Sequence, residues 1–189
     1  NIYPVEVDGS LDECSELIKK IFADTDLVEE YGLTLANTMN IGRLLPQTFF
    51  YTYAFSRLKD KVYGDIFYAL APGNYGNLVA GLYGWKFSLP VNGFITECTP
   101  SLTVDSTGKC HMLDTAIPLK NRFSANPASP SNLERLEGIF IRNPAVIKGF
   151  VFPQRVSDKE REAACKELFM KYGIFADGET SGAYAAAKK

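Results

Sequence analysis

The sequence predicts an α/β domain with an open, mostly parallel sheet and flanking helices. Short apolar runs of strand length alternate along the chain with longer runs of helical periodicity, which is the order expected of a parallel sheet. The central apolar runs are continuous rather than alternating, as in strands that are covered on both faces. At 189 residues, with 46% hydrophobic and 22% charged residues, the chain can bury a core and has the composition of an ordinary globular protein.

Three helix starts carry the same capping-box pattern, S-x-x-E. "IYPVEV" alternates like a short strand, and the helix that follows it starts at Ser10 with Glu13. The pattern returns at residues 131–134, before "RLEGIFI", and at residues 157–160, before "REAACKELFMKYG". Apolar residues at helical spacing predict one apolar face for the first of these helices: Leu11, Cys14, Leu17, Ile18 and Ile21.

The middle of the chain predicts helix, strand, helix and strand in succession. "IGRLLPQTFFYTYAFSRLKD" (residues 41–60) is apolar nearly all round, which predicts one long buried helix with Pro46 in its first turn. We expect a fully buried strand in "DIFYALA", a helix in "NLVAGLYGWKF", and further strands in "VNGFITE" and "KGFVF". Residues 100–130 have weak periodicity and are expected to be mostly loop.

Charge and composition narrow the classes of function. The formal net charge is −2, so no whole-chain argument favours nucleic acid or an anionic membrane as a partner. Residues 1–30 contain nine acidic and two basic residues, and an anionic ligand is therefore favoured beyond them. The four cysteines have no C-x-x-C spacing and His111 is the single histidine, which predicts free thiols and no metal site. Because no apolar run is long enough for a bilayer and the amino terminus is not a signal peptide, we expect a cytoplasmic protein.

The stretch "APGNYGN" (residues 71–77) lies between an expected strand and an expected helix. Ligands of open α/β sheets collect at such junctions, and Gly73 and Gly76 would leave backbone amides uncovered beside the positive end of the helix dipole. The spacing fits neither the G-x-G-x-x-G fingerprint of dinucleotide sites nor a P-loop, which ends in G-K-[ST]. Two interpretations stay open on pattern alone: a cradle for a phosphate, or a tight turn whose asparagine side chains cap the helix.

Several segments, in the same order, resemble threonine synthase, a pyridoxal-phosphate (PLP) enzyme family of the tryptophan-synthase-β fold, fold type II. "VEVDGSLDECSELIKK" is similar to the family's V-E-G-x-F-D-D-C-Q segment, and "LANTMNIGRLLPQTFFY" is similar to its N-S-x-N-x-x-R-L-L-P-Q-x-x-Y-Y run. "PGNYGN" resembles its T-G-N-F-G-N loop, "PSNLERL" its S-N-F-E-R-L, and "DGETSGAYAAAKK" its D-P-H-T-A-x-G-x-A-A tail. The chain departs from the pattern at "ITECTPSL", where the family has T-N-x-N-D, and at "GET", which replaces P-H-T.

The resemblance implies a PLP site in this chain. The glycine loop binds the cofactor phosphate in the family, which assigns that role to Gly73, Asn74, Tyr75, Gly76 and Asn77. The tail threonine lies near the pyridine nitrogen in the family, which selects Thr180. A polar cluster near the cofactor or the substrate is matched by Asn37, Asn40 and Arg43. An arginine there could grip a substrate phosphate bidentately, and the alternative is a surface arginine at a helix start.

The family reaction converts O-phospho-L-homoserine and water into L-threonine and phosphate, with PLP held as a Schiff base on a catalytic lysine. That lysine lies in an S-F-K-D-like motif upstream of the V-E-G segment, and no lysine here occupies such a motif. The resemblance therefore implies a partial chain without a catalytic residue, which binds PLP weakly and is inactive by itself. Residues 1–35 are expected to be the remainder of a small mobile subdomain, and residues 36–189 a large PLP-phosphate-binding subdomain that is incomplete at its carboxyl terminus.

Two other functions stay open. A non-catalytic remnant of the fold would act as an interaction or oligomerisation module and would hold no phosphate at residues 73–77. Another fold type II PLP lyase would act on a different amino acid, although the R-L-L-P-Q run favours threonine synthase. The expected partners are a phosphorylated amino acid in the family reaction and, because an incomplete sheet exposes strand edges, the missing amino-terminal portion or a second copy of the chain. Neither nucleic acid nor membrane is expected.

Overall fold

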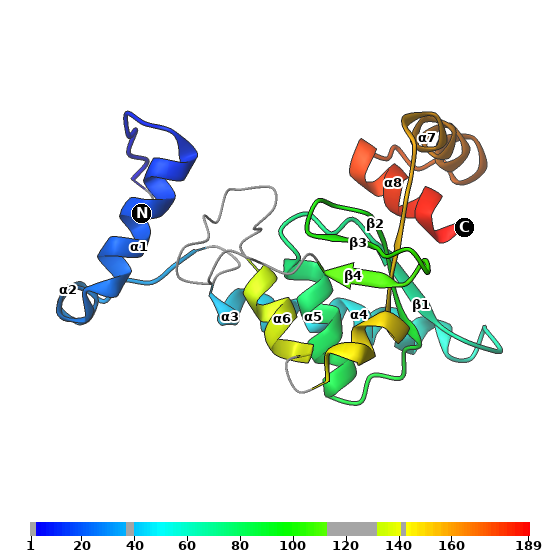
Figure 1. Ribbon diagram of the computed structural model, residues 1–189, viewed down its shortest axis with the longest axis horizontal. Coiled ribbons are helices and arrows are strands. Elements are labelled where there is room, and N and C mark those ends of the chain that lie inside the picture. Colours follow the sequence, from blue (N-terminus) through cyan, green and yellow to red (C-terminus); the bar gives the residue numbers. More distant parts are fainter. Residues whose placement is uncertain (1–2, 37–39, 113–131, 141–142) are drawn as a thin grey trace.

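The computed structural model describes residues 3–36, 40–112, 132–140 and 143–189, and Figure 1 follows their elements along the chain. The helices within these residues are α1 (Leu11–Ala23), α2 (Thr25–Tyr31), α3 (Ile41–Leu44), α4 (Thr48–Leu58), α5 (Gly76–Lys86), α6 (Leu133–Phe140), α7 (Asp158–Tyr172) and α8 (Gly178–Ala187). The 3-10 segments are η1 (Leu45–Gln47) and η3 (Pro144–Gly149). The strands are β1 (Phe67–Leu70), β2 (Gly93–Glu97), β3 (Leu102–Val104), β4 (Cys110–Met112) and β5 (Val151–Gln154).

A parallel sheet of three strands, in the order β1-β2-β5, forms the centre of the fold. Leu70 of β1 lies opposite Thr96 of β2, and Thr96 lies opposite Pro153 of β5, so the carboxyl ends of the strands meet at one edge. β3 and β4 form a separate antiparallel hairpin. The succession of β1, α5 and the parallel strand β2 confirms the predicted α/β class with a mostly parallel sheet.

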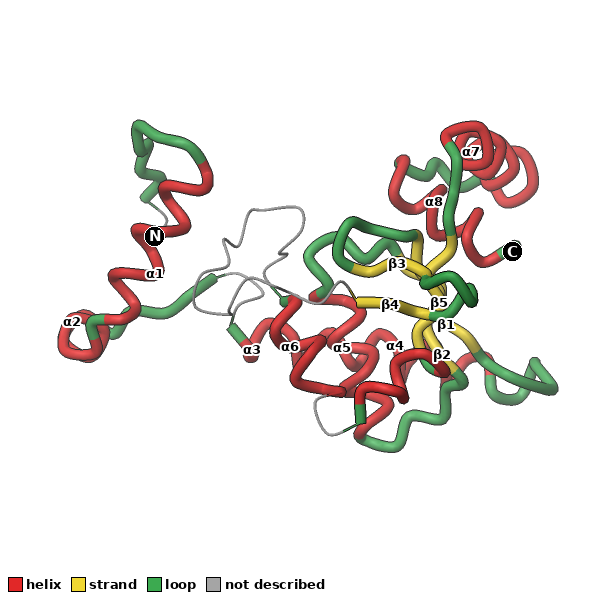
Figure 2. Tube along the Cα trace, in the orientation of Figure 1, coloured by secondary structure: helices red, strands yellow, loops and turns green. Residues whose placement is uncertain are grey.

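Helices cover both faces of this sheet (Figures 1 and 2). On one face Gly81 of α5 packs so closely on β2 that an added Cβ would lie 2.5 Å from the ring of Phe94. On the other face Gly182 of α8 packs against the carboxylate of Glu97. Side chains three residues apart on a strand point to opposite faces, so α5 and α8 lie on opposite sides of β2.

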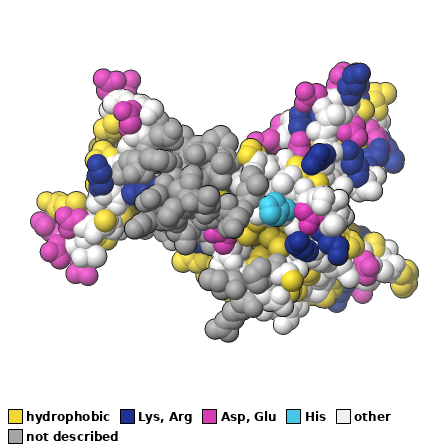
Figure 3. All heavy atoms as spheres, in the orientation of Figure 1, with side chains coloured by type: hydrophobic (Ala, Val, Ile, Leu, Met, Phe, Trp, Pro, Cys, Tyr) yellow, Lys and Arg dark blue, Asp and Glu magenta, His cyan; other side chains and the backbone are white. Residues whose placement is uncertain are grey.

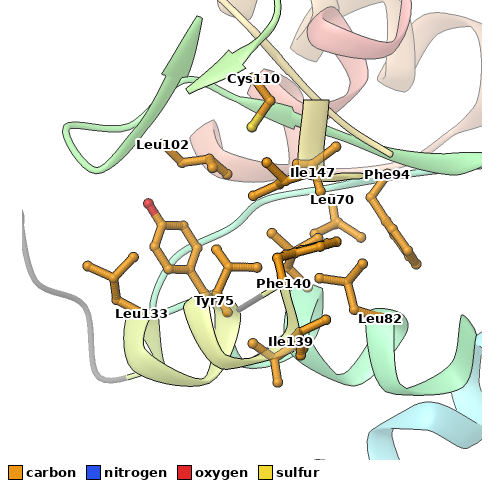
Figure 4. Packing of buried hydrophobic residues seen from close by; sticks show 14 of the residues in the cluster. Leu70, Tyr75, Leu82, Phe94, Leu102, Cys110, Leu133, Ile139, Phe140 and Ile147 are labelled. Carbon is orange, nitrogen blue, oxygen red and sulfur yellow. The ribbon is translucent and has the colours of Figure 1, made fainter. Parts of the chain in front are cut away.

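The main core lies between the sheet and α5, with α6 and the hairpin around it (Figure 4). α5 is apolar all round, and it is buried along most of its length because other elements surround it. The ring of Trp85, on this helix, packs against Phe150 with ring centroids 4.3 Å apart. The largest fully buried apolar side chains of the core are Tyr75, Phe94, Leu44, Leu78, Leu82, Leu102, Leu133 and Leu136.

The single long buried helix predicted over residues 41–60 is wrong in two respects. Pro46 has no amide hydrogen to donate, and the segment around it is the 3-10 turn η1, which separates the short helix α3 from α4. α4 is also not buried all round, since Phe49, Phe50 and Tyr53 have exposed fractions of 69%, 73% and 67%. One side of α4 packs on α5, and the other side presents these aromatic rings at the surface.

The strands differ from prediction at three places. β1 is not fully buried: among the described strands it pairs with β2 alone, and Phe67 is 42% exposed, because β1 is an edge strand. The part of "IYPVEV" that is described, residues 3–7, is exposed and forms no strand. The stretch predicted as loop contains the β3–β4 hairpin up to Met112, and residues 113–131 lie outside the described part of the chain.

The first and last predicted capping boxes are confirmed. Ser10 Oγ accepts from the Glu13 amide at 3.3 Å, and a Glu13 carboxylate oxygen accepts from the Ser10 amide at 2.7 Å. Ser157 and Glu160 make the same pair of hydrogen bonds at the start of α7. The remaining predicted box includes Ser131, which lies outside the described residues.

α1 and α2 lie apart from the sheet and its helices (Figures 1 and 2). α1 contacts α2, and its predicted apolar face is only partly covered, since Leu17 and Ile18 are 51% and 37% exposed while Cys14 and Ile21 are half-buried. Acidic side chains gather at this end of the molecule (Figure 3). The assignment of residues 1–35 to a small subdomain stays a prediction.

The side chains considered for metal or redox chemistry are scattered. The four cysteines are free thiols, of which Cys110 is buried and the other three are half-buried. His111 is exposed on β4. Within the described ranges, no group of three or more His, Cys, Asp or Glu side chains could hold a metal ion. None of the helices in these ranges combines the length and the apolarity that crossing a bilayer requires.

Candidate functional site

The glycine loop, residues 71–77, connects β1 to α5 at the carboxyl edge of the sheet. β1 ends at Leu70 and α5 begins at Gly76, so the loop passes directly from the strand into the first helical turn. The register of Leu70 with Thr96 places the loop beside the carboxyl end of β2. Ligands of open α/β sheets bind at this edge. The structure therefore contains the strand, loop and helix that the sequence predicts around a phosphate cradle.

The backbone of the glycine loop enters the left-handed region twice. Gly73 has a φ of +45° and Tyr75 a φ of 62°, and the Tyr75 amide donates to the Pro72 carbonyl at 2.6 Å. The next amides, those of Gly76 and Asn77, are in the first turn of α5 and have no acceptor among the described residues. A left-handed residue followed by helical ones makes successive amides converge into a concavity that binds anions. The positive end of the α5 dipole lies at the same place.

The two asparagine side chains of the loop differ in their surroundings. Asn77 Nδ2 donates to the Ala71 carbonyl at 2.6 Å, and Asn77 Oδ1 accepts from the Leu78 amide at 2.8 Å, so this side chain stabilises the turn. Asn74 is exposed at the tip of the loop, and the space next to Gly73 is open. The Asn77 side chain thus stabilises the turn, while the Asn74 side chain is exposed and the amides of Gly76 and Asn77 have no acceptor among the described residues.

Tyr75 points its side chain into the core. The ring is fully buried, and Figure 4 shows it between Leu102 and Leu133. Its hydroxyl is hydrogen-bonded to Thr99 Oγ1 and to Ser101 Oγ, the latter at 3.0 Å. Burial raises the pKa of Tyr75, and the hydrogen bonds from the two hydroxyl groups oppose that shift. Tyr75 can therefore serve a phosphate through the backbone conformation that it sets, not through its side chain.

A buried hydroxyl without a partner lies at the same edge of the sheet. Thr96 is fully buried, and its Oγ1 has no hydrogen-bond partner in the described part of the chain. It shares a face of β2 with Phe94, which packs against α5, so it lies on the side of the sheet where the glycine loop enters that helix. Buried polar groups are almost always paired, and a phosphate or a water beside it would supply the partner. The sequence signal was a polar residue on the buried face of "GFITE", and it was missed.

Thr180 is exposed in the first turn of α8. Its amide donates to Asp177 Oδ1 at 2.7 Å, and this hydrogen bond lowers the pKa of the Asp177 carboxyl. Two residues further on, Gly182 contacts Glu97, which ends β2 and pairs with Arg161 of α7. The beginning of α8 and the glycine loop therefore lie at the same edge of the sheet.

The predicted polar cluster is described at two of its positions, since Asn37 lies outside the described residues. Asn40 caps α3 by accepting from the amide two residues further on at 2.9 Å, and it donates to the Leu35 carbonyl at 3.0 Å. Arg43 is exposed, and its guanidinium donates to the Ala36 carbonyl. Both side chains hold the chain that precedes α3, and α3 packs against α5, the helix that follows the glycine loop.

Several lysines in the second half of the described chain are paired with acidic side chains. Lys148 lies 3.1 Å from Asp105, and Lys189 lies 2.8 Å from Glu160. These ammonium groups hold the β3–β4 turn and the carboxyl terminus in place.

Comparisons of sequence identify threonine synthases as relatives of this chain. No family model matches the chain. A threonine synthase from Buchnera aphidicola subsp. Schizaphis graminum is 34% identical over 187 residues, which are 97% of this chain and 43% of the relative. A threonine synthase from Escherichia coli is 30% identical over 191 residues, which are 100% of this chain and 44% of the relative.

Solved structures agree with the sequences. The crystal structure of threonine synthase from Escherichia coli matches with a TM-score of 0.71 at 29% identity, over 97% of this chain and 43% of that one. A PLP-bound threonine synthase from Brucella melitensis matches with a TM-score of 0.62 at 18% identity, a likeness of fold. The chain spans less than half the length of the relatives that it matches. It is therefore homologous, over almost all of its own residues, to a part of threonine synthase.

Proposed function

We propose that this chain forms the cofactor-phosphate-binding part of a PLP-dependent threonine synthase. The observation that carries the proposal is the glycine loop at the carboxyl edge of the sheet, with two amides at the start of α5 that have no acceptor among the described residues. The proposed reaction of the whole enzyme converts O-phospho-L-homoserine and water into L-threonine and phosphate. PLP, when bound, supplies the electron sink that such a reaction needs.

The proposed roles of this chain are to bind and orient the cofactor. The amides of Gly76 and Asn77, together with the Asn74 side chain, would donate to the phosphate at the positive end of α5. The hydroxyl of Thr180, at the start of α8, would serve as the neutral partner of the ring nitrogen. The buried Thr96 hydroxyl would gain a partner from the phosphate or its hydration.

The substrate-binding residues and the cellular compartment are also proposals. Asn37, Asn40 and Arg43 would contact the phosphorylated amino acid, since a guanidinium suits a phosphate. Turnover is not proposed for these residues alone, because the sequence has no lysine in an S-F-K-D-like motif. Four free thiols suit the reducing cytoplasm as the place of action.

The proposal predicts saturable binding of inorganic phosphate and of PLP, measured by titration calorimetry. Asn74→Asp places a carboxylate at the tip of the glycine loop, and repulsion should weaken both affinities by about tenfold or more. Asn74→Ala removes one donor without adding a charge, and a loss of about threefold to tenfold is expected.

Ser56→Asp is the matched control. Ser56 is exposed on α4, where the substitution adds the same charge outside the glycine loop. Its affinities should fall less than those of Asn74→Asp, because the new charge is on another element and faces the screening solvent. Equal losses in Asn74→Asp and Ser56→Asp, or no saturable binding by the wild type, would refute the loop as a phosphate site.

A second candidate function is a non-catalytic interaction module, and the exposed aromatic rings of α4 favour it. Phe49, Phe50 and Tyr53 form one apolar surface on this helix. Large exposed apolar patches mark sites of protein association. This candidate predicts a folded chain without phosphate affinity, so the same titration separates the two functions.

A further inference from the structure

One residue of the glycine loop holds a costly conformation. Tyr75 has φ 62° and ψ 3°, in the left-handed region, where a residue with a side chain costs about 1–3 kcal/mol. Such a residue persists when its surroundings hold it in place. The two residues of the loop that are glycines meet no such cost, so the conformation of Tyr75 needs a separate support.

The support visible in the structure is the end of the Tyr75 side chain. Its hydroxyl is hydrogen-bonded to Thr99 Oγ1 and to Ser101 Oγ. These partners belong to a closed turn, in which the Thr99 amide donates to the Leu102 carbonyl at 2.8 Å and the Leu102 amide donates to Thr99 Oγ1 at 3.0 Å. Ser101 and Leu102 are fully buried, so the turn is a firm anchor for the ring.

The conformation of Tyr75 decides where the next amides point. With Tyr75 in the left-handed region, the amides of Gly76 and Asn77 converge on one point at the start of α5. The Tyr75 amide itself is used by the Pro72 carbonyl, and its carbonyl accepts from Val79 at 2.9 Å. A shift of Tyr75 into the ordinary helical region would turn these amides apart and open the concavity.

The hydroxyl is the part of the Tyr75 side chain that makes these hydrogen bonds. A phenylalanine at residue 75 would keep the ring but would make no hydrogen bond to Thr99 or Ser101.

We propose that the Tyr75 hydroxyl, anchored by Thr99 and Ser101, is a positioning device that holds the glycine loop in its anion-binding conformation. Tyr75 is a positioning residue, because its side chain is turned away from the ligand side of the loop. The proposal rests on the proposed phosphate-binding function of that loop. It adds that the affinity depends on a contact between two segments that lie far apart in the sequence.

The test compares Tyr75→Phe with Tyr68→Phe in the full chain. Each substitution removes one hydroxyl, and the Tyr68 hydroxyl donates at 2.8 Å to the Tyr51 carbonyl, on α4. Tyr75→Phe should weaken inorganic phosphate and PLP binding by about 3- to 10-fold. Without ligand, it should also speed hydrogen exchange of the Tyr75 and Val79 amides, which donate to the Pro72 and Tyr75 carbonyls, by a similar factor. Tyr68→Phe should change neither quantity.

Ser101→Ala removes one of the two partners of the Tyr75 hydroxyl, so it should change both quantities in the same direction but by a smaller factor. The double variant should differ little from Tyr75→Phe. A Tyr75→Phe protein with a lower free energy of unfolding but unchanged phosphate affinity and loop exchange would show that the hydroxyl is merely structural, and the proposal would fail. If the wild type binds no phosphate, the proposed function fails by itself. The exchange measurement then still decides whether Tyr75 holds the loop.

Discussion

At the scale of single residues, two glycines determine how closely the helices approach the sheet. Gly81 lets α5 lie directly on the ring of Phe94, and Gly182 lets α8 lie against Glu97. Neither glycine has a positive φ, so the requirement is for space and not for backbone freedom. The capping glycines differ, since Gly32 and Gly173 end α2 and α7 in the left-handed conformation.

We expect Gly81→Ala to lower the free energy of unfolding by about 1–3 kcal/mol, because the new methyl group would overlap the Phe94 ring. Gly138→Ala is the matched control on α6, where an added Cβ meets nothing within 4 Å. It should raise the free energy of unfolding by up to about 1 kcal/mol through helix propensity. Urea unfolding measures both, and equal effects of the two substitutions would disprove the close packing of α5 on β2.

At the scale of elements, α7 buries few side chains, and contacts at its start contribute to its stability. Of its 15 residues, Ala164 and Leu168 are buried. The Ser157–Glu160 box caps its start, and Lys189, at the carboxyl terminus, pairs with Glu160 at 2.8 Å. The hydrogen bonds from Lys189 and from the Ser157 amide lower the pKa of Glu160 to about 2.

This shift predicts an acid-sensitive α7. The pKa of Glu160 is lower in the folded chain than the ordinary 4.5, so its stabilisation is complete above that value and is lost as the pH falls from about 4.5 to about 2. Glu160→Gln keeps the shape of the capping box but removes the charge, and it should flatten this part of the stability profile, measured by thermal unfolding against pH. Glu179→Gln, an exposed acid of α8, is the control and should keep the wild-type profile.

An unchanged profile in Glu160→Gln would contradict the role given to the Glu160 carboxylate.

Ser157→Ala offers an independent check of the capping box at neutral pH. Loss of the cap should cost about 1 kcal/mol of stability.

At the scale of the whole molecule, the aromatic surface of α4 predicts self-association. Phe49 and Phe50 are 69% and 73% exposed, and burying each ring would contribute about 1.5–3 kcal/mol. Changing both to Gln should weaken association by more than about tenfold, measured by sedimentation velocity over a range of concentrations. Tyr63→Gln, at a fully exposed position outside α4, should leave it unchanged. Association that survives loss of both rings would exclude α4 as the contact.

The sequence by itself determined those features that depend on neighbours in the chain. The capping boxes at Ser10 and Ser157 are contacts between residues three apart, so their pattern is sufficient. The alternation of strand and helix predicts the parallel sheet, and the two glycines predict the loop between β1 and α5.

Only the tertiary structure decided what depends on distant segments. Hydrophobic periodicity reports how apolar a segment is but not which element covers it, so β1 became an edge strand and α4 kept exposed rings. The inward turn of Tyr75 onto Ser101 and the unpartnered hydroxyl of Thr96 arise in the same way, from segments that meet only after folding. Neighbouring residues in the chain therefore determine where the candidate site lies. Its precise shape depends on the tertiary structure, because packing determines burial and the hydrogen-bond partners across the sheet.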